Sequence, residues 1–337
     1  MILPGGQPDS IDAAVRALAA GELVGLPTET VYGLAADACN DAAVARVFAA
    51  KGRPSDHPLI VHVASAAGVT KFAQHIPAFA QSLIDAFWPG PLTLILPRVP
   101  GVAAACAGGQ DSIGLRCPSH PVALALLKAC AEVGIAGLAA PSANQFGRIS
   151  PTTAAHVQAE LGQELLTLDG GACSVGIESS IIDCTRGAPV LLRPGVLTRA
   201  QLESACGCAV LERDAALGPG APRASGTLES HYAPKAKLRL MDSESLKTAA
   251  RLLGAELTAS PGAPPAVALY SRASQSSPTP GLLQRRMPDD AVAVARELFS
   301  VLRDFDAAGV KLIWVETPPP SHEWDGVRDR LQRAAAS

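Results

Sequence analysis

The first 200 residues alternate between short apolar segments, which predict strands, and longer segments with apolar residues on one face, which predict helices. A helix is expected over residues 10–21, because Ser10 can cap its start and Gly21 can end it. Further helices are expected over 41–52, 119–134 and 153–162, and strands over 22–27, 58–63, 91–96, 112–118, 137–141, 165–171, 179–184 and 189–195. Several of these strands follow one another without a helix between them. The pattern therefore predicts an α/β fold with a mixed twisted sheet and flanking helices, rather than a purely parallel sheet.

The pattern changes near residue 214. Residues 214–236 are rich in Gly, Pro, Ala and Ser, a composition typical of a linker. Beyond them, strands are expected over 238–241, 266–271 and 312–316, and helices over 245–254, 289–309 and 324–336. This order predicts a small, doubly wound, Rossmann-like unit. We therefore expect a first domain over residues 1–213, a linker over 214–236 and a second domain over 237–337.

The composition describes a chain that can build a large core and carries little net charge. Of its 337 residues, 48% are hydrophobic and 18% are charged, so a disordered chain is not expected. Lys and Arg number 28 against 31 Asp and Glu, which gives a formal net charge of -3. This balance argues against a protein whose main role is to coat nucleic acid, but it does not exclude a local anion-binding site.

The eight cysteines form no CxxC pair. The CxC of Cys206 and Cys208 has no second pair nearby, so no zinc site is expected. Cys117, Cys130 and Cys184 stand among apolar residues and are expected to be buried. The N-terminus lacks the regions of a signal peptide, and no apolar run is long enough to span a membrane. A cytoplasmic protein with reduced thiols and no membrane contact is therefore expected.

The chain has neither of the common phosphate-binding glycine motifs and neither a GxSxG nor an HExxH motif, so any nucleotide must be bound by dispersed side chains. Such side chains gather where the predicted strands end, which is where open α/β sheets bind ligands. They are Thr28, Thr30, Tyr32, Lys51, Arg53, His57, His62, Ser112, Arg116, Ser142, Asn144, Ser150, Ser179, Ser180 and Arg193. Arg binds carboxylate or phosphate with a planar fork and Lys binds phosphate as a point charge. The four Arg and Lys side chains would therefore suit a polyanion and a carboxylate.

Each of these groups also has a structural interpretation. Lys51 and Arg53 can form the solvated end of a helix, where the helix dipole favours cations. His62 can be a core histidine with satisfied hydrogen bonds, and the serines and Asn144 can cap helices or form turns. Arg116 is different, since a buried guanidinium is costly without a partner or a ligand. At this level the sequence predicts an α/β domain with a cation-lined crevice for an anion, and both interpretations stay open for the other residues.

Seven ordered segments resemble the YrdC-like domain: PTETVYGL, KGRPSDHPLIVHV, FWPGPLTLIL, GLRCP, APSANQFGRISPT, GIESSIID and LLRPG. With the segment SHYAP at residues 230–234 and the C-terminal unit, the chain resembles the long, two-domain form of the threonylcarbamoyl-AMP synthases. The resemblance covers nearly the whole chain and is densest over residues 20–200 and 229–234.

The resemblance implies an enzyme that joins L-threonine, bicarbonate or CO2, and ATP into L-threonylcarbamoyl-AMP and releases pyrophosphate. This nucleotidyl transfer is the first step of N6-threonylcarbamoyladenosine formation at position 37 of tRNA, and separate threonylcarbamoyl-transferase proteins complete it. By position in the matching motifs, L-threonine would be bound by Thr30, His62, Arg116, Ser180 and the main chain at Ala140. ATP would be bound by Lys51, Arg53, His57, Ser112, Ser142, Asn144, Ser150, Arg193 and Tyr232.

The implied chemistry needs no protein nucleophile, because the carbamate formed from threonine itself attacks the α-phosphate. Lys51 and Arg53 would act as the catalytic residues by offsetting the developing negative charge. Mg2+ would help them while bound through the ATP phosphates, with no metal site of the protein's own. Because the carbamate decomposes in water, a lid over residues 218–234 is expected to close on the site.

Two features depart from the family pattern. His57 stands where the family commonly has Asn, which puts its ATP contact in question. The linker is longer before SHYAP and lacks the Pro-Gly-containing form often seen there, so the details of the lid do not carry over. The second domain shows no catalytic set, and Glu316, His322 and Glu323 are expected to lie in a solvated turn.

Two other functions are alternatives to this one. An RNA-binding YrdC-like module without synthase activity is disfavoured by the acidic balance and by the lack of interleaved basic and aromatic residues. A carbamoyl-transfer domain like that of hydrogenase maturation proteins is disfavoured because the cysteine spacing offers no zinc finger. A weak direct contact with tRNA stays open.

Overall fold

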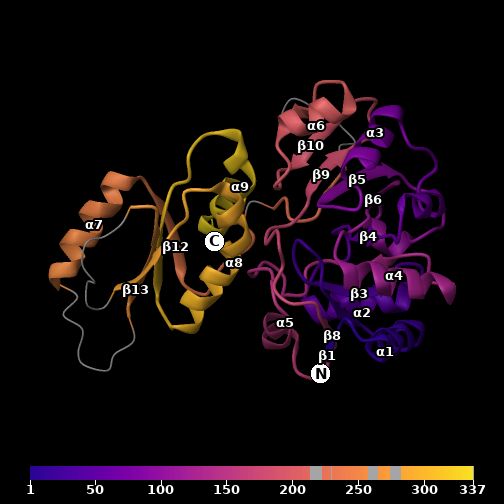
Figure 1. Ribbon diagram of the computed structural model, residues 1–337, viewed down its shortest axis with the longest axis horizontal. Coiled ribbons are helices and arrows are strands. Elements are labelled where there is room, and N and C mark those ends of the chain that lie inside the picture. The colour runs from indigo at the N-terminus through magenta and orange to yellow at the C-terminus, as the bar shows by residue number, and fades with distance from the viewer. Residues whose placement is uncertain (213–221, 229, 257–264, 274–281, 337) are drawn as a thin grey trace. The chain divides into compact units, whose positions relative to one another are not determined.

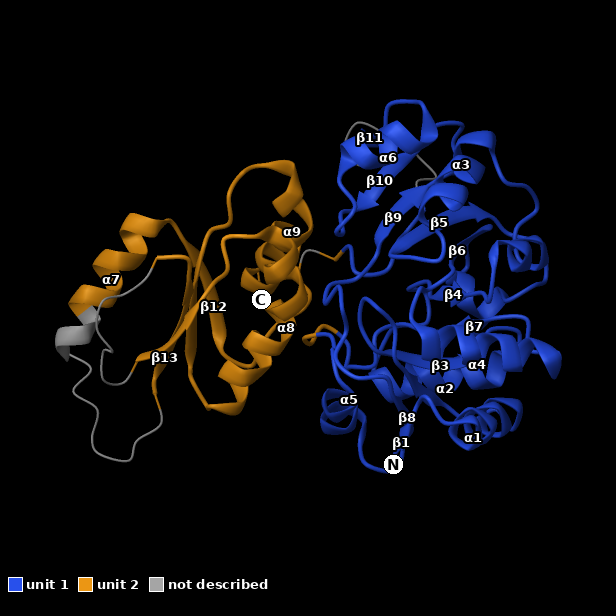
Figure 2. Ribbon diagram, in the orientation of Figure 1, with its two compact units in different colours: residues 1–146, 150–227 blue, residues 147–149, 228–337 orange. Residues whose placement is uncertain are grey.

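The computed structural model describes residues 1–212, 222–228, 230–256, 265–273 and 282–336, and the chain forms two compact units (Figure 1). Unit 1 comprises Met1–Phe146 and Ser150–Thr227, and unit 2 comprises Gly147–Ile149 and Leu228–Ser337 (Figure 2). The predicted linker is divided between them. Residues 222–227 belong to unit 1 and residues from 228 onward to unit 2, whereas residues 213–221 and 229 lie outside the described residues.

Unit 1 is built on a mixed sheet, as the sequence predicted. Within the described residues the sheet has eleven strands in the order β1-β8-β2-β3-β7-β4-β6-β5-β9-β10-β11. Pairs such as β4 with β6 are parallel, and pairs such as β5 with β6 are antiparallel. The strands are β1 (Ile2–Pro4), β2 (Val24–Leu26), β3 (Gly33–Asp37), β4 (Ile60–His62), β5 (Leu92–Pro97), β6 (Ser112–Arg116), β7 (Leu138–Ala139), β8 (Leu166–Asp169), β9 (Ser180–Asp183), β10 (Val190–Arg193) and β11 (Leu211–Glu212).

Helices flank this sheet. They are α1 (Pro8–Ala19), α2 (Asp41–Lys51), α3 (Ala78–Phe87), α4 (Pro121–Glu132), α5 (Ala154–Leu161) and α6 (Arg199–Cys206), with 3-10 turns η1 (Ala66–Lys71) and η2 (Ala104–Ala107). Helix α2 shows how local sequence positions the site. The Asn40 side chain accepts from Ala43 N at its start, and Gly52 ends it with a φ of 60°, a left-handed conformation that glycine adopts without strain. Lys51 is thereby fixed at the last position of the helix.

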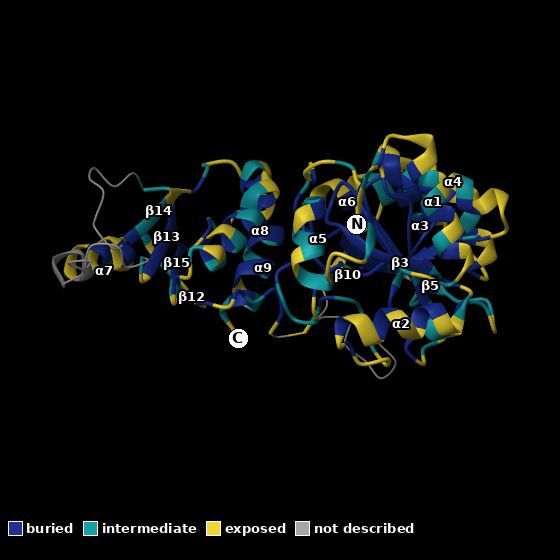
Figure 3. Ribbon diagram, turned by 90° about the horizontal axis from the view of Figure 1, so that it is seen from below, coloured by how far each residue is buried: buried dark blue, intermediate teal, exposed yellow. Residues whose placement is uncertain are grey.

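Apolar side chains lie on both faces of the sheet. Leu34 and Ala36 of β3 belong to one buried cluster and Ala35 to another, as the alternation of side chains along a strand requires. Burial is concentrated in the strands and on the inner sides of the helices (Figure 3). Cys117, Cys130 and Cys184 are buried, which confirms the prediction for these three thiols.

Unit 2 is built on a parallel sheet with the strand order β12-β15-β13-β14. Its described elements are β12 (Lys237–Met241), α7 (Ser243–Glu256), β13 (Val267–Ser271), β14 (Leu282–Arg286), α8 (Ala291–Ala307), β15 (Leu312–Glu316), η4 (His322–Trp324) and α9 (Asp325–Ala335). The predicted doubly wound unit is confirmed, with β14 as a fourth strand that the sequence did not predict. None of the described helices is long and apolar enough to cross a membrane.

One expectation for unit 2 is wrong. Glu316 does not lie in a solvated turn but ends β15, where it is 4% exposed. Its carboxylate accepts from Ser271 Oγ and from the main-chain N–H of Arg272, each at 2.8 Å. A buried carboxylate with these partners joins two neighbouring strands. His322 and Glu323 are exposed, as expected.

Candidate active site

Five neighbouring strands of unit 1 bring the predicted site residues together. In the sheet, β4, β6, β5, β9 and β10 lie side by side. His62 at the end of β4 is paired with Arg116 at the end of β6. Ser180 begins β9 beside Leu92 of β5, and Arg193 ends β10 beside β9. Residues far apart in the sequence thus meet at adjacent strand ends.

Arg116 lies at the centre of a buried polar cluster. The residue is 4% exposed, and its guanidinium makes three contacts. One terminal nitrogen, Nη1, donates to Thr30 Oγ1 at 2.8 Å, and Nε donates to the Gly90 carbonyl at 3.3 Å. The other terminal nitrogen, Nη2, lies 2.7 Å from Glu29 Oε1. The expectation that a buried Arg116 needs a partner is therefore met by the fold.

Thr28 and Tyr32, which flank this cluster in the sequence, have structural partners. Thr28 Oγ1 donates to the Val31 carbonyl at 2.6 Å and lies 2.9 Å from Thr30 Oγ1, so it shapes the turn before β3. Tyr32 Oη donates to the Gly171 carbonyl at 2.8 Å. Burial raises the pKa of Tyr32 well above its usual value, so the hydroxyl stays protonated. Both side chains hold the loop that carries Thr30.

His62, Ser180 and Ala140 are the other residues predicted to contact threonine. Ser180 Oγ is buried without a hydrogen-bond partner within the described chain, and the buried His62 Nδ1 has none of good geometry, although its ring lies near the carbonyls of Ile60 and Leu138. Burial, and then the nearby charge of Arg116, lower the pKa of His62 to about 3, so its ring is neutral at physiological pH. The Ala140 N–H donates to the Ile60 carbonyl at 3.1 Å. The main-chain N–H of Ala140 is therefore already used.

Lys51 is buried at the end of α2, not solvated there. It is 2% exposed, and its Nζ donates to the carbonyls of Ser142 and Asn144, each at 2.6 Å. Burial, and then repulsion from Arg53, lower the pKa of Lys51 to about 7. The interpretation of Lys51 as a solvated helix end is wrong, because the loop after β7 covers the ammonium group.

Arg53 and Arg193 converge on one short segment, residues 222–227. Arg53 Nη2 donates to Ser225 Oγ at 3.0 Å and to the Pro58 carbonyl at 2.9 Å. Arg193 Nη1 donates to the Ser225 carbonyl at 2.9 Å, while its Nη2 donates to the Ser179 carbonyl at the same distance. Both residues are mostly buried. The two guanidinium groups therefore face Ser225 from different elements, Arg53 from the loop after α2 and Arg193 from the end of β10.

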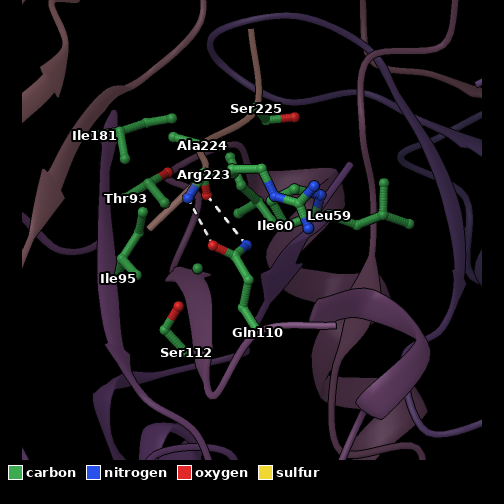
Figure 4. Close-up of a pocket in the computed structure, with 12 residues that line it drawn as sticks. Leu59, Ile60, Thr93, Ile95, Gln110, Ser112, Ile181, Arg223, Ala224 and Ser225 are labelled. Atoms are coloured by element: carbon green, nitrogen blue, oxygen red, sulfur yellow. Dashed lines mark hydrogen bonds between the residues drawn. The ribbon is translucent and has the colours of Figure 1, made fainter. Parts of the chain in front are cut away.

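A pocket lies beside this segment and is lined by Ser112 together with residues 223–225 and the apolar side chains of Ile60, Ile95 and Ile181 (Figure 4). Arg223 N donates to Gln110 Oε1 at 2.6 Å, and Gln110 Nε2 donates to the Arg223 carbonyl at 3.4 Å (Figure 4). The Arg223 guanidinium also pairs with Asp56 at 2.8 Å. Residues 222–227 are thus held to the remainder of unit 1 at both Arg223 and Ser225.

Three other predicted ATP residues lie close to Lys51 or Arg53, two through main-chain hydrogen bonds and one through ring packing. Ser142 and Asn144 hold Lys51 through their carbonyls, and the Asn144 side chain donates to the Gln145 carbonyl at 2.7 Å. His57 is half-buried and packs edge-on against Phe146, with ring centroids 5.4 Å apart. Arg53 lies 5.6 Å over the same ring. Burial, and then Arg53, lower the pKa of His57.

Two acidic residues near the site were not predicted from the sequence. Glu29 pairs with Arg116, and Glu178 is hydrogen-bonded to Ser150 Oγ and interacts electrostatically with Lys51. Both carboxylates are buried. The available signal was weak, since each acid stands alone in an apolar or hydroxyl-rich segment, but a buried acid there requires a cation or donor nearby.

Tyr232 belongs to unit 2. Its ring is 1% exposed and stacks on Phe299 of α8, with centroids 5.5 Å apart. Arg330 of α9 lies 5.3 Å over the same ring. Tyr232 also has a φ of 61°, which is uncommon for a non-glycine residue.

Comparison with known proteins covers both units. The Sua5–YciO–YrdC family model, described as "Telomere recombination", matches residues 16–195, and the model described as "Threonylcarbamoyl-AMP synthase, C-terminal domain" matches residues 197–336. The threonylcarbamoyl-AMP synthase of Pyrococcus abyssi is 37% identical over 327 residues, which cover 94% of this chain and 91% of that protein. The chain belongs to the threonylcarbamoyl-AMP synthase family.

Other members of this enzyme family agree with that assignment. The threonylcarbamoyl-AMP synthase of Bacillus subtilis is 36% identical over 336 residues, covering 96% of this chain and 92% of that protein. The crystal structure of P. abyssi Sua5 complexed with L-threonine superposes with a TM-score of 0.84 at 35% identity, covering 96% of this chain and 94% of that chain. The family's two-domain fold therefore extends over nearly the whole chain.

Proposed function

We propose that this chain synthesises L-threonylcarbamoyl-AMP from L-threonine, bicarbonate or CO2, and ATP, with release of pyrophosphate. The observation that carries the proposal is the buried Arg116 cluster, together with Ser180 Oγ, which lacks a partner among the described residues, and His62 Nδ1, which lacks an aligned one. Because buried polar atoms are nearly always paired, these two suit a small polar ligand. The relative crystallised with L-threonine supports that ligand here. The named relatives favour a synthase over an RNA-binding module without synthase activity.

Arg116 would bind the carboxylate of L-threonine. A guanidinium has five N–H groups in a fixed plane. Two of those of Arg116 donate to Thr30 and Gly90, while Nη2 lies beside Glu29 without an aligned hydrogen bond. Both terminal nitrogens therefore keep an N–H group for a ligand, which suits a carboxylate bound by two parallel hydrogen bonds. Thr30 would hold the guanidinium in this orientation and contact the substrate with its hydroxyl.

The remaining threonine contacts would come from His62, Ser180 and Ala140. The neutral ring of His62 can accept a hydrogen bond at one nitrogen and donate one at the other, and Ser180 Oγ can do both. Ala140 would contribute its carbonyl oxygen, since its N–H is bonded to Ile60. These groups would recognise the hydroxyl and the amine of threonine.

The ATP phosphates would lie against Lys51, Arg53 and Arg193. Lys51 uses two of its three N–H groups on carbonyl oxygens, so the third can point at a phosphate. Ser179 and Ser180 are consecutive, and Arg193 is bonded to the Ser179 carbonyl, which would place the α-phosphate next to threonine. Ser112, Ser142, Asn144 and Ser150 would line this side, and His57 would extend it.

Lys51 and Arg53 would act as catalytic residues through charge. As the carbamate oxygen bonds to the α-phosphorus, negative charge grows on the phosphate oxygens and pyrophosphate leaves. Cations fixed in a buried site stabilise that charge far more than they would in water. The site would also accelerate the reaction by holding the two anionic reactants in line, because bound reactants do not need to meet by a random encounter.

Mg2+ fits these residues as a partner of the phosphates. Among the described residues no group of three or more His, Cys, Asp or Glu side chains could hold a metal ion. The groups around the proposed phosphate position are cations and hydroxyls, which bind phosphate oxygens. Mg2+ is commonly bound by phosphates and waters with one carboxylate or none, and Glu178 lies on this side. When bound, the ion would offset phosphate charge during pyrophosphate release.

The lid and the domain boundaries are part of the proposal. We assign catalysis to residues 1–213, and a Rossmann-like domain of unassigned role to residues 237–337, with the linker 214–236 between them. Residues 222–227 would form the described part of the lid, because Ser225 contacts both Arg53 and Arg193. Residues 218–221 and 229 of the predicted lid lie outside the described residues. Contact of Tyr232 with the nucleotide stays a prediction.

The test is pyrophosphate release from ATP by the full chain, measured with and without L-threonine and with and without bicarbonate. We expect release only when both are present, with L-threonylcarbamoyl-AMP identified by its mass. ATP turnover that is indifferent to L-threonine would contradict the proposed function. Salt-dependent tRNA binding without such turnover would favour the RNA-binding alternative. The product would pass to separate threonylcarbamoyl-transferase proteins.

A further inference from the structure

Glu29 is a buried acid at the amino-acid side of the site, and the roles assigned so far do not use it. It lies between β2 and β3 and is 4% exposed. Its position is fixed on both sides, since the Val175 N–H donates to the Glu29 carbonyl at 2.7 Å and Thr28 Oγ1 ties the turn to Val31. The backbone thus holds this carboxylate in one place beside Arg116.

The carboxylate of Glu29 has unused hydrogen-bonding capacity. Its Oε1 lies 2.7 Å from Arg116 Nη2, yet neither oxygen accepts an aligned hydrogen bond within the described residues. The two groups therefore form an ion pair, but no N–H bond of Arg116 Nη2 points at the Glu29 oxygen. A carboxylate can accept about four hydrogen bonds, so a buried one in this state can take a donor from a ligand.

Around Glu29 the charges are balanced. The titratable side chains that interact with Glu29 include Arg116, Cys117 and Cys173. Burial raises the pKa of Cys117 to about 11 and that of Cys173 above its usual range, so both thiols are neutral. His62, also near Arg116, is neutral because its pKa is about 3. Glu29 and Arg116 therefore form one negative and one positive pole.

Two opposite poles suit a zwitterion better than they suit a simple carboxylate. An amino acid carries a carboxylate and an ammonium group at the same carbon. If only Arg116 were charged, the substrate ammonium would be buried without a partner, which is costly. We infer that Glu29 binds the α-ammonium of L-threonine, opposite the carboxylate on Arg116, and takes its first proton.

This inference rests on the proposed function, because the amine must become neutral before it can react. The ammonium passes one proton to the Glu29 carboxylate, which gives a neutral amine and a carboxylic acid. The nitrogen lone pair then forms the N–C bond to CO2 while one C–O π bond breaks, which leaves a positive nitrogen and a negative oxygen. The nitrogen loses one proton to water, and the product is the carbamate. Glu29 acts in the first of these steps only.

A purely structural role for Glu29, as the residue that orients Arg116, makes a different prediction. In that case its loss would weaken every ligand with a carboxylate at this position. If Glu29 binds the ammonium, its loss would weaken only ligands that carry the ammonium. A pair of ligands that differ at this one group separates the two roles.

The experiment measures calorimetric binding of L-threonine and of (2S,3R)-2,3-dihydroxybutanoate, in which a hydroxyl replaces the ammonium. Wild type should bind L-threonine more tightly than the analogue. The measured ratio is the dissociation constant of the analogue divided by that of L-threonine. In Glu29→Gln, which keeps the side-chain shape, we expect this ratio to fall by at least about tenfold. ATP affinity should stay unchanged. Glu22→Gln, an exposed acid paired with Arg46, is the control and should retain the wild-type ratio.

An unchanged ratio in folded Glu29→Gln would overturn the inference. Should that variant fail to fold, Glu29→Asp provides the same test, because its carboxylate is withdrawn by one methylene. A reduced ratio in Glu29→Asp supports the contact and a wild-type ratio rejects it. Absence of L-threonine binding to wild type would remove the proposed function itself, which distinguishes the two failures.

Discussion

The two halves of the proposed site in unit 1 differ in their number of cations. On the amino-acid side, Arg116 is paired with Glu29 at 2.7 Å and the nearby His62 is neutral. On the phosphate side, Lys51, Arg53 and Arg193 each donate to carbonyl or hydroxyl oxygens of unit 1. The amino-acid half pairs one cation with one acid. The phosphate half gathers three cations, and of these Lys51 also interacts with the carboxylates of Glu178 and Glu160.

The difference matches what each half would bind. A zwitterion brings one charge of each sign, so a balanced pair complements it at little cost. A triphosphate brings several negative charges, which a group of closely spaced cations complements. The pKa of Lys51 reflects this crowding, because burial and then Arg53 lower it to about 7. Charge, more than shape, would therefore sort the two substrates.

Removal of the most buried cation should have the largest effect. Lys51→Ala is expected to lower threonine-dependent pyrophosphate release by at least about 100-fold, because a fixed charge at the phosphates is lost. Its fold, checked by circular dichroism and thermal unfolding, should persist. Lys71→Ala removes an exposed lysine of unit 1 and serves as the control. Near-normal release by folded Lys51→Ala would show that this charge is not needed.

The second largest effect is expected in the pH dependence of ATP binding, which should differ from that of L-threonine binding. Bound phosphates favour the protonated form of Lys51, so its pKa should rise from about 7 on binding. Since the free lysine loses its proton above pH 7, ATP binding should take up a proton and weaken as pH rises. The expected slope between pH 7.5 and 9.5 is up to about tenfold per unit.

Calorimetry in buffers of different ionisation enthalpy measures this uptake directly. Lys51→Arg is the matched control. A guanidinium keeps its charge throughout this pH range, so ATP binding by this variant should not weaken as the pH rises. L-threonine binding should show no step from His62 between pH 5 and 8, since its pKa is about 3. A similar slope in Lys51→Arg would assign the titration to another group.

The smallest expected effect concerns the segment over the phosphate side. The Arg223 side chain is 51% exposed, so trypsin can reach the bond after it. With L-threonine and a non-hydrolysable ATP analogue, cleavage there should slow by about threefold or more, as a closed segment opens less often. The exposed Arg286 of unit 2 gives an internal control whose cleavage rate should not change. Equal rates at Arg223 in both states would argue against a lid.

The fold was predictable where the sequence pattern was strong. Apolar strands such as β5 and β6 and the capped helix α2 lie where the pattern placed them. β3 was not predicted, because Gly33–Asp37 follows a turn motif and contains no β-branched residue. β14 has the sequence LLQRR, whose polar end is unlike a buried strand, and it lies at the edge of its sheet.

The site was predictable in its cations but not in its acids. Arg116 stood out because a guanidinium inside an apolar strand needs a partner. The identity of that partner depends on which loop the sheet brings alongside, and periodicity does not encode this. Glu29 was not predicted as a site residue, because an acid between two threonines in a turn is typically solvated. Likewise, the position of Lys51 at the end of a helix favours an exposed side chain. Its burial depends on the carbonyls of Ser142 and Asn144, which lie about 90 residues further along the chain.

The central claim is that the two substrates are bound by separate halves of one site. Its most direct test is to measure both KM values, for L-threonine and for ATP, in Arg116→Lys and in Arg193→Lys. Each variant keeps the charge and loses the planar fork. We predict that Arg116→Lys raises the KM for L-threonine by at least about 30-fold and leaves that for ATP within about threefold, and that Arg193→Lys does the reverse. Equal increases of both KM values in either variant would contradict the account.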